Sequence, residues 1–174
     1  MLQAKTASEY NQTSGASPVL VSELPVFGSD TRDIYNPRLI NINNGYILGD
    51  FGIPATQDGC IIKDSLMWED LNEDAPKLSA IWAERDHCTF LGGEYIPLYG
   101  RWSENFYHWV WENVPAIIMA ETAGYRGNYI ACSNKYIPQI FEMLGVSINR
   151  VFGYRGGSFR VEKLYAPVRP TANS

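Results

Sequence analysis

The sequence predicts one α/β domain in which an antiparallel, β-rich front precedes strand–helix–strand units. Three observations lead to this prediction. The chain has 174 residues, enough for one domain with a sizeable core. Residues 18–64 contain short apolar runs separated by tight-turn patterns. After Phe90, strand and helix patterns alternate at a spacing typical of parallel βαβ connections.

The composition narrows the class of protein. Hydrophobic residues make up 45% of the chain and charged residues 19%, as in globular proteins. The net charge is −5 and no basic stripe is present, which argues against nucleic-acid binding. No apolar run approaches the roughly 20 residues of a membrane-spanning helix. The sequence therefore predicts a cytoplasmic protein, with a flexible lead-in at 1–17, a single domain at 18–168 and a loose tail at 169–174.

Turn residues organise the predicted front. Asn44-Gly45 separates apolar runs at 38–43 and 46–50 and predicts a hairpin, because a type I′ turn needs positive φ at both central residues. Residues 57–60, Gln-Asp-Gly-Cys, predict a second turn before a strand at 60–62. Together the two turns predict an antiparallel meander. The acidic segment 64–77 predicts a short helix or loop that ends near Pro76.

The rest of the chain alternates strands and helices. The expected elements are a strand at 95–99, a helix at 103–123, a strand at 128–132, a helix at 135–144, a strand at 150–152, and a hairpin-like pair around 155–157 that ends in 161–168. Ser103 is the expected N-cap of the first helix and Gly124 its C-cap. Pro115 conflicts with an unbroken helix by about 3 kcal/mol, so we expect a kink after Asn113 or two consecutive helices.

The helix predicted at 103–123 carries a polar stripe. Asn105, His108 and Glu112 fall at i, i+3 and i+7, on one side of the helix. A neighbouring, mostly apolar face is expected to be buried and consists of Phe106, Trp109, Val110, Asn113 and Ile117. This is the only place in the sequence where polar, titratable groups lie beside bulky aromatics, so it is the candidate site.

Two interpretations of the stripe are open. Histidine is the usual proton acceptor near neutral pH, and a carboxylate one turn away can orient its ring, which suits deprotonation of a sugar hydroxyl by His108 with Glu112 behind it. Alternatively, His108 is a half-buried histidine that only bonds Glu112 and anchors the helix.

Other chemistry has weaker support. His108 and Glu112 could supply two metal ligands, but the only other histidine is His87 and no zinc-binding spacing occurs, so no metal is predicted. Cys88 follows His87 directly, which leaves a catalytic cysteine as an alternative to an ordinary reduced thiol. Arg101 could hold an anion at the helix N-terminus or be solvated. The aromatics around His108 are expected mostly in the core, although one or two could line a sugar site; they are Trp102, Tyr107, Trp109 and Trp111.

Residues 105–115, Asn-Phe-Tyr-His-Trp-Val-Trp-Glu-Asn-Val-Pro, resemble the N-[FY]-[FY]-H-W-hydrophobic-x-E-x-[LV]-P signature of glycosyltransferase family 61, the capsular-polysaccharide-biosynthesis-like proteins. Residues 141–146 (FEMLGV) and 161–167 (VEKLYAP) resemble further segments of that family. The resemblance covers about residues 20–168, and Ala116 stands where members commonly carry an arginine.

The resemblance implies a Rossmann-like layered domain, the N-terminal half of a GT-B-type enzyme. It implies inverting, metal-independent transfer from a nucleotide-sugar donor to a carbohydrate hydroxyl, with the donor gripped by a C-terminal domain or partner chain. His108 would be the base and Glu112 its orienting group, with Asn105, Tyr107 and Arg101 binding substrate. The alternative is a non-catalytic, acceptor-binding or scaffold half of a split or truncated transferase.

Overall fold

The structure is a computed structural model that describes residues 3–5, 38–62, 65, 71–100 and 102–168. One mixed sheet runs through it in the order β1-β4-β3-β2-β8-β5-β6-β7. The elements are β1 (Gln3–Lys5), β2 (Arg38–Leu48), β3 (Ile53–Ala55), β4 (Cys60–Ile62), α2 (Leu71–Ala83), η2 (Arg85–His87), β5 (Thr89–Leu98), α3 (Phe106–Thr122), β6 (Asn128–Cys132), α4 (Ile137–Met143), η3 (Ile148–Arg150), β7 (Val151–Tyr154) and β8 (Phe159–Val168).

The α/β class and the antiparallel front are confirmed. β2 pairs antiparallel with β3 and with β8, and β3 pairs antiparallel with β4 across the predicted turn at 57–59. The predicted parallel connections are also present, because β5, β6 and β7 pair in parallel and are joined through α3 and α4.

The hairpin predicted at Asn44-Gly45 is wrong. β2 continues through this dipeptide and pairs with β8 in one register on both sides of it. Asn44 does adopt a positive φ of 51°, but the result is a switch in the strand's faces: Ile42 and Ile47, five positions apart, share one core cluster. A Cβ at Gly45 would lie 2.9 Å from a methyl carbon of Leu164, so close packing of β8 also requires glycine there.

The last predicted hairpin is also wrong, because β7 pairs with β6 whereas β8 inserts between β2 and β5. Only residues 155–158 link the end of β7 to the start of the parallel strand β8. A link this short requires the sheet to curl until these two ends meet. β5 bends at Gly93, where φ is 94° and its register with β8 shifts. Across the curl, the Tyr154 hydroxyl donates to the carbonyl of Gly49.

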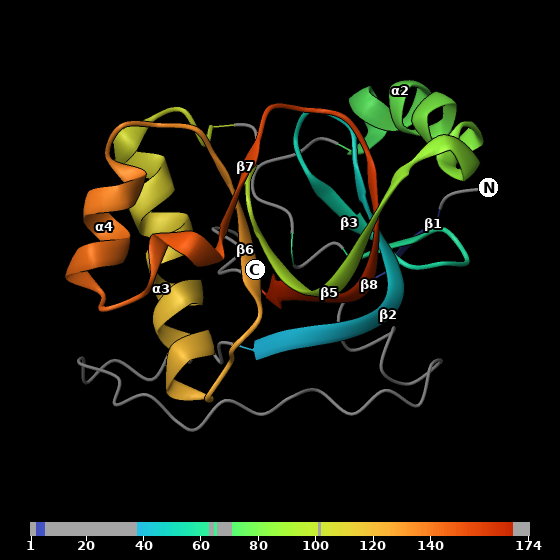
Figure 1. The fold of residues 1–174 in the computed structure, drawn as a ribbon. Coiled ribbons are helices and arrows are strands. Elements are labelled where there is room, and N and C mark those ends of the chain that lie inside the picture. Colours follow the sequence, from blue (N-terminus) through green and yellow to red (C-terminus); the bar gives the residue numbers. More distant parts are fainter. Residues whose placement is uncertain (1–2, 6–37, 63–64, 66–70, 101, 169–174) are drawn as a thin grey trace, which may run out of the picture.

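Three clusters of buried side chains hold the fold together. The first lies inside the curl and draws from strands at both ends of the sheet, including Ile42, Ile62, Ile130, Tyr154 and Leu164. The second joins α3 and α4 to the outer face of β5 and β6, including Ile96, Trp109, Ile117, Tyr129 and Phe141. The third lies under α2 and includes Tyr46, Leu48, Leu78 and Trp82. Accordingly, α3 and α4 lie side by side at one end of the molecule and α2 at the other (Figure 1).

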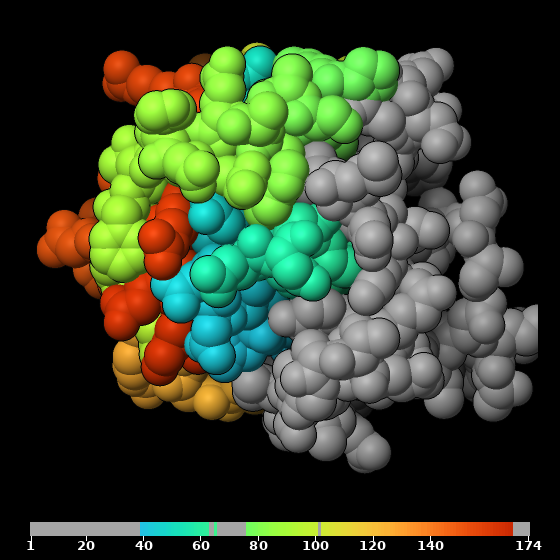
Figure 2. Space-filling view, turned by 90° about the vertical axis from the view of Figure 1, so that its right-hand side faces the viewer, coloured from blue at the N-terminus to red at the C-terminus, as the bar shows by residue number. Residues whose placement is uncertain are grey.

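Helix α2 begins and ends later than expected. The sequence predicts an element that stops near Pro76, but the helix continues to Ala83 with the proline inside it. Burial explains the continuation: Leu78 is 5% exposed, and Trp82 meets the ring of Tyr46 edge-on at 5.1 Å. Figure 2 views this side of the molecule, where α2 lies next to the surface of β2 and β3. Tertiary packing thus offsets the local cost of the proline.

Helix α3 is a single helix through Pro115, so two consecutive helices are ruled out. It ends as predicted at Gly124, which has φ of 80° and donates to the carbonyl of Glu121. Its inner face is almost fully buried, at Trp109, Asn113, Ala116, Ile117, Met119 and Ala120.

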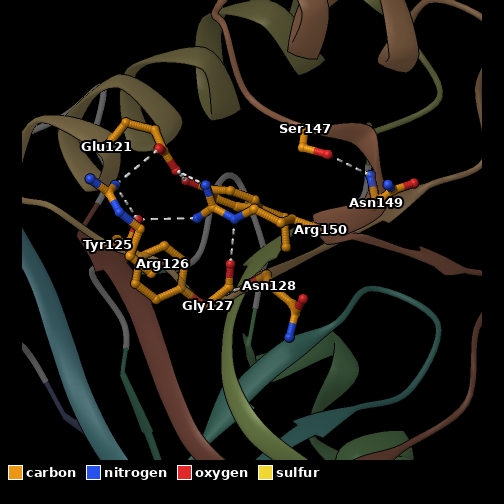
Figure 3. A network of polar contacts seen from close by, with 9 residues as sticks. Glu121, Tyr125, Arg126, Gly127, Asn128, Ser147, Asn149 and Arg150 are labelled. Atoms are coloured by element: carbon orange, nitrogen blue, oxygen red, sulfur yellow. Dashed lines mark hydrogen bonds and ion pairs between the residues drawn. The ribbon is translucent and has the colours of Figure 1, made fainter.

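A polar network closes the C-terminal end of α3 (Figure 3). The Arg150 guanidinium lies 2.8 Å from Glu121 Oε1 and donates to the carbonyls of Gly127 and Tyr125 at 2.8 and 3.2 Å. The Tyr129 hydroxyl donates to the same carboxylate oxygen at 2.6 Å. The network therefore ties α3 to β6 and to η3.

The chain ends were predicted to be flexible. Gln3–Lys5 of the predicted lead-in form β1, which pairs in parallel with β4. The remainder of that segment and the predicted tail lie outside the described residues. No helix in the described ranges is long and apolar enough to cross a membrane.

Candidate functional site

The N-terminal end of α3 carries the candidate site, and Asn105 is the residue that starts the helix. Its side-chain oxygen accepts hydrogen bonds from the backbone amides of Tyr107 and His108 at 3.0 and 3.3 Å. The predicted N-cap, Ser103, instead accepts from the Gly100 amide at 2.6 Å and lies in the turn before the helix. The first amides of the helix are thus satisfied by Asn105, two positions later than the sequence indicated.

The structure brings His108 and Glu112 together. The Nδ1 atom of His108 lies 3.1 Å from Oε1 of Glu112. The carboxylate side chain is 2% exposed, whereas the imidazole is 37% exposed. With Glu112 ionised, Nδ1 carries the proton and Nε2 carries the lone pair. The pair therefore has a buried orienting group and a partly open base, the arrangement needed to accept a proton from outside.

Aromatic side chains surround the histidine on the surface. The Trp102 ring stacks on the His108 ring with centroids 5.9 Å apart and planes 27° apart. Tyr107 meets the imidazole edge-on at 6.0 Å and lies 6.2 Å from Trp111. All three aromatics are at least half exposed, so the expectation that they belong mostly to the core is wrong. Among the four aromatics named from the sequence, only Trp109 is a core residue.

The expected apolar face also needs correction at Phe106, which is 57% exposed rather than buried. The helix starts at this residue, so its side chain lies beyond the edge of the core and only meets the Tyr136 ring at 5.1 Å. Exposure of Tyr107 and Trp111 could have been found from the sequence, since at i and i+4 they share the side opposite Trp109.

The remaining predicted site residues differ in status. Tyr107 projects to the surface beside the histidine. Asn105 uses its oxygen as a cap, which leaves its amide NH₂ group for a substrate. Arg101 lies outside the described residues.

Neither Cys88 nor Cys132 is an activated nucleophile. Burial and the nearby Asp86 carboxylate raise the pKa of the Cys88 thiol. Burial raises the pKa of Cys132 to about 11, against the opposing effect of a hydrogen bond with Tyr136. Both thiols are therefore protonated at neutral pH. Across the described part of the chain, no three His, Cys, Asp or Glu side chains group closely enough to hold a metal ion.

The loop after β6 contacts the site, and the sequence indicated no such role. The carbonyl of Ser103 accepts hydrogen bonds from Tyr136, Asn134 and Cys132, roughly thirty positions later in the chain. Burial raises the pKa of Tyr136 to about 12, so its hydroxyl remains a donor. No spacing rule connects residues so far apart, which is why sequence reasoning missed them.

Comparison with known proteins gave no match to a family model, to a curated protein or to a solved structure. The chemistry of the site therefore rests on its own geometry. A half-buried histidine backed by a buried carboxylate and flanked by exposed aromatic rings can accept a proton from a hydroxyl of an apolar-faced ligand, such as a sugar.

Proposed function

We propose that this chain is a glycosyltransferase domain of the family 61 type, acting in the cytoplasm in the synthesis of a polysaccharide or glycan. It would transfer a sugar from a nucleotide-sugar donor to a carbohydrate hydroxyl with inversion. The observation that carries the proposal is the His108–Glu112 pair, at 3.1 Å, with its carboxylate buried and its imidazole partly open. The sequence resemblance around this pair supplies the reaction class.

In the proposed reaction, Nε2 of His108 takes the proton of the acceptor hydroxyl. The hydroxyl oxygen attacks the anomeric carbon of the donor as the bond to the diphosphate breaks on the opposite side. The Glu112 carboxylate stabilises the imidazolium that forms, and the proton later passes to water. No metal or other cofactor takes part in this scheme, so removal of divalent cations should leave transfer unchanged.

The substrates would be divided between two parts. The exposed rings of Trp102 and Trp111 offer flat surfaces for the CH groups of an acceptor sugar, next to Tyr107 and the NH₂ group of Asn105. Arg101, as the resemblance implies, would bind an anionic group of a substrate. The donor nucleotide would be held by a C-terminal domain or partner chain of Rossmann-like form, completing a GT-B-type enzyme.

The test compares His108→Ala with His87→Ala in a transfer assay that includes the donor-binding part. We expect His108→Ala to lower turnover by roughly 10²–10⁴-fold, because a general base is lost. His87 is exposed and lies in η2, so its variant should retain full turnover. Near-normal turnover by a folded His108→Ala protein would rule out the catalytic role.

A second candidate is a non-catalytic acceptor-binding half, favoured by the aromatic surface that extends along α3 beyond the histidine. Ligand-observed NMR with a panel of glycans and nucleotide sugars separates the two. Glycan binding that is unchanged in His108→Ala, without any transfer by the assembled protein, would support the binding-only alternative.

A further inference from the structure

The backbone carbonyl oxygen of Ser103 accepts three hydrogen bonds. It accepts hydrogen bonds from the Tyr136 hydroxyl at 2.9 Å, from Asn134 Nδ2 at 3.2 Å and from the Cys132 thiol at 3.1 Å. Ser103 is 1% exposed, so these donors replace water at this oxygen. The contacts join the turn before α3 to the end of β6 and the loop that follows it.

Tyr136 is oriented as well as bonded. Asn134 Nδ2 lies 2.8 Å from the Tyr136 hydroxyl oxygen, so it donates there and leaves the hydroxyl proton for Ser103. The tyrosine ring also meets Phe106 at 5.1 Å and Trp109 at 5.9 Å, both edge-on. One side chain therefore contacts the turn before α3 and the first turn of the helix.

The residue next to Ser103 is Trp102, whose ring stacks on His108. The Trp102 side chain is half exposed, so burial alone does not determine where it lies. Its position depends on the backbone that carries it, and the Ser103 carbonyl belongs to that backbone. A chain of contacts thus runs from the loop after β6, through Ser103 and Trp102, to the ring of the proposed base.

We infer that Asn134 and Tyr136 are positioning residues, which hold the turn at Ser103 so that Trp102 stays stacked on His108. Their meaning for catalysis rests on the proposed function, but the geometry they maintain can be measured without any turnover. The stack restricts rotation of the imidazole about its side-chain bonds, while the bond to Glu112 sets its tautomer.

The experiment measures the chemical shifts of the His108 imidazole protons in the purified full chain. The Trp102 ring current changes the chemical shifts of these protons, and Trp102→Leu gives the values without it. In Tyr136→Phe, which keeps the ring and removes the hydroxyl, we expect loss of at least half of the Trp102-dependent shift. Asn134→Ala should act in the same direction.

The matched control is Tyr125→Phe. It removes a hydroxyl that donates to a backbone carbonyl, that of Asn128 at 2.8 Å, near the other end of α3. We expect this variant to retain the full Trp102-dependent shift. Retention of the full shift in a folded Tyr136→Phe or Asn134→Ala protein would overturn the inference, as would an equal loss in Tyr125→Phe.

The outcome is separable from that of the proposed function. If His108→Ala transfers sugar normally, the catalytic proposal fails, while a lost ring-current shift in Tyr136→Phe still establishes the positioning contact. If His108 is essential but the full shift survives in either folded loop variant, His108 remains the proposed base and the positioning role of the loop is wrong.

Discussion

The two ends of helix α3 use polar and aromatic residues in opposite ways. At the C-terminal end, Arg150 and Tyr129 both bond to the Glu121 carboxylate, and Arg150 also donates to backbone carbonyls. The Arg150 and Glu121 side chains are 20% and 25% exposed. At the N-terminal end, the carboxylate of Glu112 is buried, but the imidazole bonded to it is 37% exposed and bordered by exposed aromatics.

The difference separates a structural cluster from a candidate site. A network whose members satisfy one another stabilises the fold and has little capacity left for a ligand. A buried carboxylate that holds a partly open base leaves one reactive atom for another molecule. Four predictions test this contrast, beginning with the largest expected effect on stability.

Arg150→Ala should cause the largest loss of stability. It removes the nearer of the two cations paired with Glu121 and the donor to the Gly127 carbonyl, and it leaves the Tyr125 carbonyl with Arg126 alone. We therefore expect the free energy of unfolding to fall by about 3 kcal/mol. Urea unfolding followed by circular dichroism measures this. Arg155→Ala, an exposed arginine, is the control and should change stability by no more than about 0.5 kcal/mol. Equal effects of the two substitutions would show that the polar network at the C-terminal end of α3 does not stabilise the fold.

Tyr129→Phe should cost about 2 kcal/mol, because it removes a 2.6 Å hydrogen bond to a carboxylate. It should also change the response to alkali. Burial, followed by the bond to Glu121, raises the pKa of Tyr129 above its ordinary value of 10.0. The unfolded chain therefore loses this proton first, so the stability it contributes is complete below about pH 10 and is lost as the pH rises further.

The pH effect is read from urea midpoints of both proteins at pH 8 and pH 11. Tyr125, whose pKa burial also raises, remains in both, so the difference isolates Tyr129. The variant should lose less stability over this interval than the parent chain. An identical loss would mean that Tyr129 ionises equally in the folded and unfolded states.

Asn105→Ala should cost about 1 kcal/mol, since the cap of two helix amides is lost at the open end. Asn105→Asp keeps a capping oxygen and places a negative charge at the helix N-terminus, so its stability should match the parent's. Both changes remove the NH₂ group offered to a sugar. Weaker glycan binding in Asn105→Asp at unchanged stability would therefore assign substrate contact to Asn105. Unchanged binding would mean that Asn105 acts only as the N-cap of α3.

Trp111→Ala should have the smallest effect on folding, less than about 0.5 kcal/mol, because the side chain is 64% exposed. If the aromatic surface binds an acceptor sugar, glycan affinity should fall roughly 3–10-fold, the value of about one stacking contact. Ile118→Ala, on the same helix and 39% exposed, is the control and should leave affinity unchanged. A large loss of stability in Trp111→Ala would show that Trp111 stabilises the fold rather than forming a ligand-binding surface.

Local chemistry predicted much of this structure. The turn at 57–59, the strand at 128–132 and the helix stop at Gly124 follow from short-range rules of turn and cap formation. The spacing of His108 and Glu112 was enough to place them together, because residues four apart on a helix always face one another. These features need no information from distant residues.

The pairing of distant strands could not be predicted from these local rules. Asn44-Gly45 has the local preference of a hairpin, yet β8, more than a hundred residues later, pairs along the whole of β2 and keeps it extended. The same strand lies between β2 and β5, whereas a local hairpin would have paired it with β7. Local propensities of about 1 kcal/mol are outweighed by a ladder of hydrogen bonds and the burial beneath it.

By itself, the sequence determined the α/β class, the antiparallel front, the helix that carries the candidate site and the pairing of His108 with Glu112. Only the tertiary structure decided the curl of the sheet, the exposure of Trp102, and the hydrogen bond from Tyr136 to the turn at Ser103. The first group depends on contacts within one turn of helix or one hairpin. The second depends on which surfaces remain exposed once strands far apart in the chain have packed. The periodicity of a local sequence segment does not specify this long-range packing.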